Sequence, residues 1–191
     1  MKIVLIGGFC EMEEMIYRAG HEIVRIVGPD EDEAYIISGD KSIPIVVSPD
    51  GALRHKVVEK YAAVGFRFTT IVAKTADVSE SATLGEGAVI AEYVIVTANT
   101  KIGRFVKINT AATVTHECFI GDYATIAPRA ILLGRVKIGE GAYIGANATI
   151  LPEMTIGKNS VIGAGAVVTK NVPDGETWVG VPAKRLHHEM I

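Results

Sequence analysis

A repeat of six residues governs the chain from Ile71 onward. Hexads follow one another without an insertion as far as residue 172, and the second position of every hexad is aliphatic. A period of six matches neither the helical period of about 3.6 nor the alternation of an uninterrupted strand, so it predicts a short strand followed by a tight turn. Three hexads close a triangular coil, and successive coils pair as parallel strands about 4.8 Å apart. We therefore predict a parallel β-helix of nearly six coils.

Residues 1–68 do not follow the hexad and indicate a different unit. "KIVLIGG" is typical of a buried parallel strand that runs into a glycine pair, and the later segments alternate between helical and strand patterns. The predicted order is strand 2–8, helix 11–20, strand 21–28, strand 43–49 and helix 51–65. We expect a small Rossmann-like α/β domain at 1–68, an all-β β-helix at 69–172 and a C-terminal tail at 173–191.

Charge and composition exclude several classes of protein. With a net charge of −3 and no long block of one sign, the chain lacks the basic face of a nucleic-acid-binding protein. No apolar stretch reaches the ~18 residues that span a bilayer, and the opening "MKIVLIGG" is too short for a signal peptide. Cys10 and Cys118 form no CxxC motif, so we interpret them as free thiols in a reducing compartment. We expect a cytoplasmic protein without nucleic-acid or membrane partners.

His116 and Glu117 interrupt the apolar repeat within "TVTHECFIGDYA" at 113–124. A histidine side chain can act as a general base because its reference pKa is about 6.5, and an adjacent carboxylate can hold its ring in one tautomer. His116 and Gly134 are both fourth residues of their hexads and are one coil apart, so they should stack at one corner of the prism. A glycine there would let a bound substrate approach the backbone, whose N–H could stabilise a negative charge that develops on it.

The repeat and the closing segment "VPDGETWVGVPAKRL", with G-x-P-A-K at Gly180 to Lys184, resemble the hexapeptide-repeat acyltransferases. The resemblance covers residues 71–186 and implies a left-handed coil. With the small domain in front, it narrows to acetyltransferases of nucleotide-linked amino sugars in bacterial glycan biosynthesis. This implies acetyl-CoA as co-substrate, no metal, and a homotrimer with sites between subunits. Apolar residues at outward first positions agree with a covered trimer face: Phe119, Ile131 and Tyr143.

The resemblance also implies roles for single residues. His116 matches the family's general base and Glu117 its helper, in a direct attack of the amine on the thioester. Asn109, in "INT", matches an orienting residue near the acceptor. Thr125 stands where many relatives carry a second histidine in contact with the acetyl donor. The other positions that match donor-binding residues are Gly134, Ala146 and Ala164.

Recognition of the nucleotide would fall to the N-terminal domain. Gly7 and Gly8 follow the first strand, where glycines commonly bring a backbone close to a phosphate. Asp30 follows the second strand, where the family places an acid near the nucleotide, although a solvated loop acid within "PDEDE" fits equally well. Phe9 to Glu11 replace the Ser, Gly and His that usually complete the glycine-rich loop, so nucleotide binding at this loop stays an open question.

Other functions share parts of this pattern. A γ-type carbonic anhydrase uses the same prism but needs three histidines on zinc, and the repeat supplies only His116. An O-acetyltransferase of a sugar or another hydroxyl compound would share the base and the donor site. A non-catalytic β-helix would serve as an assembly module. The sequence leaves open the sugar, the position of its amine, the nucleotide, and an acyl donor other than acetyl-CoA.

Overall fold

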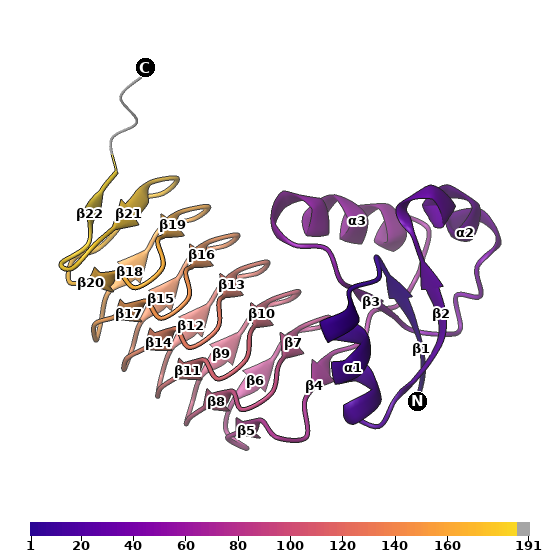
Figure 1. Cartoon of the computed structure of the whole chain (residues 1–191), viewed down its shortest axis with the longest axis horizontal. Helices are drawn as coiled ribbons and strands as arrows, with labels where there is room; N and C mark the ends of the chain where they lie inside the picture. Colours follow the sequence, from indigo (N-terminus) through magenta and orange to yellow (C-terminus); the bar gives the residue numbers. More distant parts are fainter. Residues whose placement is uncertain (187–191) are drawn as a thin grey trace.

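The computed structural model describes residues 1–186. An α/β unit packs beside the first coils of an elongated β-helix, and a short hairpin closes the opposite end (Figure 1). Within the described residues, no helix has the length and apolar character needed to cross a membrane. The predicted tail 173–191 lies partly outside the part of the chain that the structure describes.

The amino-terminal unit is built on a three-stranded parallel sheet with the order β2-β1-β3. Its strands are β1 (Lys2–Ile6), β2 (Glu22–Val27) and β3 (Ile45–Val47), and its helices are α1 (Cys10–Arg18), the 3-10 turn η1 (Pro29–Glu31), α2 (Asp32–Ser38) and α3 (Gly51–Ala63). The central strand β1 is apolar because both of its faces are covered. The predicted strands and helices of this unit are present, with ends that differ by at most two residues.

The segment after β2 was not predicted correctly. A solvated loop at "PDEDE" was the alternative to a nucleotide contact at Asp30, and no helix was expected here; Asp30 is exposed, but these residues form η1 and the start of α2. Asp32 explains the difference, because its carboxylate accepts hydrogen bonds of 2.6 Å from Lys60 Nζ and from Tyr61 Oη on α3. These contacts come from a helix that is distant in sequence, so no local pattern indicates them.

The hexads form the β-helix, and the first two residues of each hexad make a strand. The coil has three faces. Face 1 contains β4 (Ile71–Val72), β7 (Val89–Ile90), β10 (Lys107–Ile108), β13 (Thr125–Ile126), β16 (Tyr143–Ile144), β19 (Val161–Ile162), β21 (Thr177–Val179) and β22 (Lys184–Arg185). Face 2 contains β5 (Asp77–Val78), β8 (Ile95–Val96), β11 (Thr113–Val114), β14 (Ile131–Leu132), β17 (Thr149–Ile150) and β20 (Val167–Val168). Face 3 contains β6 (Thr83–Leu84), β9 (Lys101–Ile102), β12 (Phe119–Ile120), β15 (Lys137–Ile138) and β18 (Thr155–Ile156).

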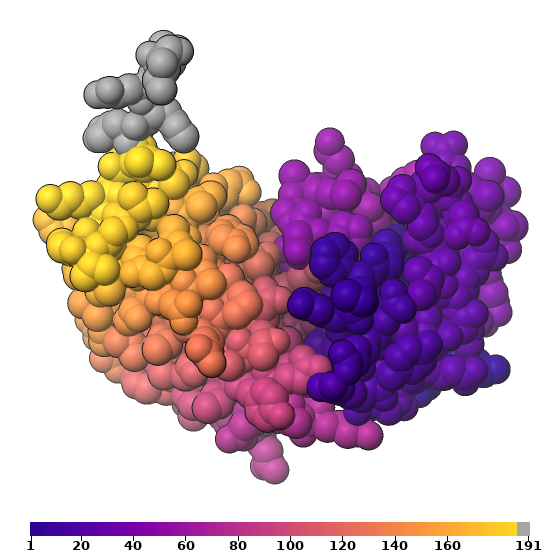
Figure 2. All heavy atoms as spheres, in the orientation of Figure 1, coloured from indigo at the N-terminus to yellow at the C-terminus, as the bar shows by residue number. Residues whose placement is uncertain are grey.

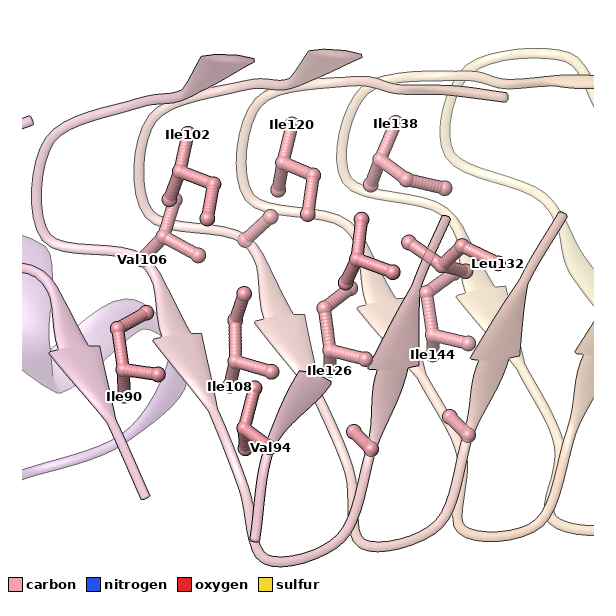
Figure 3. Packing of buried hydrophobic residues seen from close by; sticks show 14 of the residues in the cluster. Ile90, Val94, Ile102, Val106, Ile108, Ile120, Ile126, Leu132, Ile138 and Ile144 are labelled. Carbon is pink, nitrogen blue, oxygen red and sulfur yellow. The ribbon is translucent and has the colours of Figure 1, made fainter. Parts of the chain in front are cut away.

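The second residue of each strand points into the coil and stacks on its counterpart in the next coil. Ile108 pairs in register with Ile126, and Ile126 with Ile144 (Figure 3). All three side chains are fully buried. Burying one such side chain contributes roughly 2 kcal/mol, so the stacked rows supply most of the driving force for coiling. The parallel β-helix predicted from the repeat is confirmed.

The turns between faces keep the same register. We call them corner 1–2, corner 2–3 and corner 3–1 after the faces that they join. The fifth residue of most hexads has a left-handed backbone; at corner 2–3, for example, Glu117, Arg135 and Glu153 have φ angles of 59°, 62° and 67°. Such angles are uncommon for residues other than glycine. Because the turn repeats from coil to coil, side chains at equivalent positions form columns along each corner.

The outward residues differ between the three faces. Phe119, Ile131 and Tyr143, which we expected to share one covered face, lie on faces 3, 2 and 1 respectively. That prediction is therefore wrong: their spacing of twelve is not a multiple of the coil length of eighteen seen in the strand register. Beyond Asp77, face 2 has only uncharged outward residues, namely Ile95, Thr113, Ile131, Thr149 and Val167.

The amino-terminal unit is fastened to face 1 by buried polar groups. The Arg54 guanidinium, on α3, donates to the Phe105 carbonyl at 2.8 Å and to Thr125 Oγ1 at 2.6 Å. Lys107 Nζ, on β10, donates to the Ser48 carbonyl and to Asp50 Oδ1, the latter at 2.7 Å. The unit thereby covers the outward residues of the early strands of face 1.

Candidate active site

His116 and Glu117 lie at corner 2–3, in the turn between β11 and β12. The imidazole Nδ1 is 3.1 Å from Glu117 Oε2, within hydrogen-bonding distance. Both side chains are about half exposed, at 51% each. A neutral imidazole whose Nδ1–H donates to this carboxylate presents Nε2 as an acceptor, which is the tautomer required of a general base.

Gly134 occupies the same corner one coil later, directly against the imidazole. A Cβ built on Gly134 would lie 2.6 Å from both Cε1 and Nε2 of His116, closer than side-chain atoms approach. The predicted stacking of the two residues is confirmed. The close approach also explains why glycine stands at this position, since any side chain would displace the ring.

Charged side chains, one from each successive coil, form a ladder along corner 2–3. We did not predict this ladder from the sequence. Arg135 Nη1 lies 3.6 Å from Glu117 Oε2, and Arg135 Nη2 lies 2.7 Å from Glu153 Oε1. The hydrogen bond from His116, followed by the charge of Arg135, holds the pKa of the Glu117 carboxyl below its usual range. The spacing of eighteen residues between the three charged positions was the signal that could have found them.

Cys118 lies two residues from His116, and its thiol is enclosed. Its thiol is buried, and Sγ contacts the Leu133 carbonyl oxygen at 3.3 Å. Burial raises the pKa of the Cys118 thiol, which disfavours the thiolate needed for attack. The arrangement therefore suits direct transfer with His116 as base better than a thioester formed on the protein.

Asn109 lies at a different edge of the β-helix, at corner 1–2, where its Nδ2 donates to the Ile126 carbonyl at 3.1 Å. It lines a cleft of about 110 Å³ between the amino-terminal unit and face 1. The other walls include Phe9, Glu11 and Met12 from the start of α1, Asp50 from the loop after β3, and Lys107 from β10. This cleft lies beside the carboxyl ends of β1 and β3, the usual place for ligands of open parallel sheets.

The three residues that we predicted to contact the nucleotide differ in their position relative to this cleft. Gly7 has a φ of +74°, and a Cβ there would lie 2.9 Å from Pro49 Cδ, so the two loops after β1 and β3 pack closely. Gly8 follows it towards α1, where a Cβ would meet Ile26 Cγ2 at 3.0 Å. Asp30 is exposed in η1, beyond β2, and does not line the cleft.

The predicted donor residues do not gather around His116 within one chain. Thr125 is buried under α3, accepts the hydrogen bond from Arg54, and borders a second cleft of about 400 Å³. The surface is visibly hollowed between α3 and the later coils (Figure 2). Ala146 and Ala164 lie one coil apart at corner 1–2, the edge that carries Asn109. Among these positions, only Gly134 contacts His116; Ala146 and Ala164 lie across face 2 from it, and Thr125 lies on face 1.

Comparison with known proteins shows which family has this fold. Residues 117–152 and 135–170 match the family described as bacterial transferase hexapeptide (six repeats). The fold superposes on GDP-perosamine N-acetyl transferase from Caulobacter crescentus, crystallised as a histidine-to-alanine mutant with CoA and GDP-perosamine, with a TM-score of 0.93 and 31% identity. The match covers 98% of this chain and 97% of that chain. This chain belongs to the hexapeptide-repeat acyltransferases.

Two further structures agree with this family. The acetyltransferase domain of PglB from Neisseria gonorrhoeae FA1090, in complex with acetyl coenzyme A, has a TM-score of 0.89 and 31% identity, and covers 97% of this chain and 98% of that chain. WeeI from Acinetobacter baumannii AYE has a TM-score of 0.85 and 26% identity over 97% of this chain and 100% of that chain. The chain is thus an enzyme of this acyltransferase family. Among residues 1–186, no group of three or more His, Cys, Asp and Glu side chains is arranged to hold a metal.

Proposed function

We propose that this acetyltransferase moves the acetyl group of acetyl-CoA onto the amine of a nucleotide-linked amino sugar in bacterial glycan biosynthesis, with His116 as general base. His116 Nε2 takes a proton from the amine while the amine nitrogen bonds to the thioester carbonyl carbon. The carbon–sulfur bond then breaks, and the proton passes to the departing CoA sulfur. Glu117 holds the ring by Nδ1 and balances its positive charge at the moment when it carries the extra proton.

Gly134 is proposed to stabilise the developing oxyanion. The neighbouring N–H groups of Leu133 and Arg135 donate to carbonyls of adjacent coils, at 3.1 and 3.0 Å. The Gly134 N–H makes no such bond within residues 1–186, so it is available to the thioester oxygen. The observation that carries the mechanism is the His116 ring lying on Gly134 with Nδ1 tied to Glu117, because base and oxyanion donor then flank one point.

We infer that the complete site requires a second copy of the chain. His116 lies at corner 2–3 whereas Asn109, Ala146 and Ala164 lie at corner 1–2, and both corners flank the uncharged face 2. In a C3 homotrimer with face 2 turned towards the axis, corner 2–3 of one copy meets corner 1–2 of the next. That packing would bring the base of one chain to the acceptor cleft and the donor edge of its neighbour.

The acceptor is assigned to the cleft beside Asn109. We propose that the acceptor binds between the left-handed coil and the Rossmann-like domain 1–68. In this domain, Gly7 and Gly8 are proposed to approach the diphosphate, and Asp30 is proposed to contact the nucleoside. On the donor side, Ala146 and Ala164 are proposed to leave room for the narrow pantetheine arm. Thr125, expected from the sequence to contact the acetyl donor, is buried under α3 and bonded to Arg54, so no donor contact is proposed for it. Both proposed substrates are cytoplasmic metabolites, so the enzyme is placed in the cytoplasm.

Thiol release tests this proposal. Acetyl-CoA is offered with UDP-, dTDP- and GDP-linked 4-amino sugars and with the corresponding hydroxy sugars, using wild type, His116→Ala and the control His21→Ala. We expect turnover with at least one amino sugar, lost several hundredfold in His116→Ala and retained in His21→Ala. Turnover with hydroxy sugars alone would assign an O-acetyltransferase. CoA binding without any turnover would favour a non-catalytic module.

A further inference from the structure

Arg135 is a charged side chain beside the catalytic pair to which the proposed mechanism gives no part. Its Nη1 lies 3.6 Å from Glu117 Oε2, the same oxygen that faces His116 Nδ1. Its Nε and Nη2 donate to Glu153 Oε1 at 3.0 and 2.7 Å. The guanidinium is therefore anchored on one carboxylate and extends to the catalytic one.

The backbone of corner 2–3 fixes this arrangement. Arg135 N–H donates to the His116 carbonyl at 3.0 Å, and Glu153 N–H donates to the Gly134 carbonyl at 2.9 Å. Glu117, Arg135 and Glu153 share a left-handed backbone, so their side chains leave the corner in parallel directions, one coil apart. The ladder thus follows from the register of the coil and does not depend on a flexible loop.

An ion pair between neighbouring coils is not unusual by itself. Arg104 and Asp122, at corner 3–1, form one with an Nη2–Oδ2 distance of 2.9 Å, far from His116. What separates Arg135 from Arg104 is that its partner Glu117 also binds the imidazole. Exposed pairs of this kind contribute little to folding stability, so any effect of Arg135 is expected on the chemistry of the pair.

We propose that Arg135, anchored by Glu153, is a positioning residue that holds the Glu117 carboxylate on His116 Nδ1 and offsets its charge, thereby setting the pH range in which His116 accepts a proton. This inference rests on the proposed function. Without the guanidinium, a half-exposed Glu117 gains rotamers that leave Nδ1. Its uncompensated negative charge also favours the imidazolium, which cannot act as base. Among the described residues, His116 and Arg135 are the charged groups that face Glu117, and the Cys118 thiol beside them is bonded to carbonyls.

The experiment compares Arg135→Gln, Arg135→Lys and Glu153→Gln with the matched control Arg104→Gln, which breaks an equivalent pair away from the site. Rates are measured from pH 5 to 9, and the His116 ring is titrated by NMR in the same variants. We expect Arg135→Gln to lower kcat about tenfold with the acceptor KM unchanged, and to move the acid-side midpoint of the rate profile and the NMR midpoint in the same upward direction. The kcat of Arg135→Lys should be close to that of wild type, and the kcat of Glu153→Gln should lie between those of wild type and Arg135→Gln. In a Glu117→Gln background, Arg135→Gln should change kcat by less than about twofold.

Equal NMR midpoints in wild type and Arg135→Gln, or a kcat loss that Arg104→Gln reproduces, would overturn the inference. The NMR titration needs no turnover, so it decides on the coupling even if no amino sugar is acetylated. Absence of thiol release from wild type would instead remove the proposed function. The two failures are therefore distinguishable.

Discussion

The Arg54 guanidinium donates a 2.6 Å hydrogen bond to the hydroxyl of Thr125, joining α3 to face 1 of the β-helix across 71 residues of sequence. Arg54 is 1% exposed, and desolvation lowers the pKa of its guanidinium. A buried cation is tolerated only where acceptors surround it. Here the Phe105 carbonyl and Thr125 provide them, so the seam between the two parts of the molecule is a specific contact.

Arg54→Leu should therefore destabilise the protein. The substitution leaves the Phe105 carbonyl and the Thr125 hydroxyl buried without their donor, and we expect a loss on the order of 3 kcal/mol. Chemical denaturation measures it, with the exposed neighbour Lys56→Leu as control. A change no larger than that of the control would show that the seam does not depend on this group.

Gly134→Ala should remove activity while leaving the fold intact. The new methyl group would lie 2.6 Å from the His116 ring and push it from its position. A displacement of about 1 Å at a catalytic group can cost on the order of a hundredfold in kcat. Thermal unfolding serves as the check on the fold. Retained acetyl transfer in Gly134→Ala, or a loss of activity that unfolding accounts for, would contradict this expectation.

The two cysteines should differ sharply in reactivity. Cys10 is exposed whereas Cys118 is buried, and burial keeps the Cys118 thiol protonated by raising its pKa. Iodoacetamide at neutral pH should label one thiol per native chain, at Cys10, and two after unfolding. Rapid native labelling of Cys118, located by peptide mass spectrometry, is the contrary result.

Asp50→Asn should weaken the second polar contact between the amino-terminal unit and face 1. Lys107 is 6% exposed, and burial lowers the pKa of its ammonium while Asp50 opposes this shift. Without the negative charge of the carboxylate, the buried cation keeps only neutral acceptors, so a loss of roughly 2 kcal/mol is expected. Because the folded-state pKa of Lys107 is then lowered further, the loss should shrink as pH rises towards 10.5, where the unfolded chain also releases this proton. Adding Lys107→Met should restore most of the stability, whereas an additive double mutant would disprove the coupling.

Face 2 should be the interface of the proposed trimer. Ile131→Lys places a charge in the middle of this face, whereas Thr155→Lys places one on the already charged face 3. Light scattering after size exclusion should find wild type and Thr155→Lys as trimers and Ile131→Lys as monomers without acetyl transfer. Trimers of Ile131→Lys, or monomeric and active wild type, would refute the shared site.

The sequence predicted those features that depend on the register of the coil. His116 and Gly134 are eighteen residues apart, and this spacing alone placed them in contact. The same arithmetic, applied to Glu117, would have led to Arg135 and Glu153, and it would have separated Phe119 from Ile131. The hexad period therefore contains more information than its aliphatic positions alone suggest.

Features that depend on packing between distant segments could not be predicted in this way. Asp32 begins a helix because Lys60 and Tyr61 bind its carboxylate, and Thr125 is covered because α3 brings Arg54 over it. Neither contact has a fixed spacing in sequence. The position of the cleft beside Asn109 likewise depends on how the amino-terminal unit docks on face 1.

The strict register of the coils also constrains how such an enzyme can change its length. Deleting one residue between Glu117 and Gly134 would rotate every later corner and carry the glycine away from the imidazole. Inserting one complete coil after β17 would leave that contact untouched and lengthen the edge that carries Ala164 by about 4.8 Å. Length variation among functional relatives should therefore occur in whole coils, and the number of coils beyond Gly134 determines how long a donor the edge can accommodate.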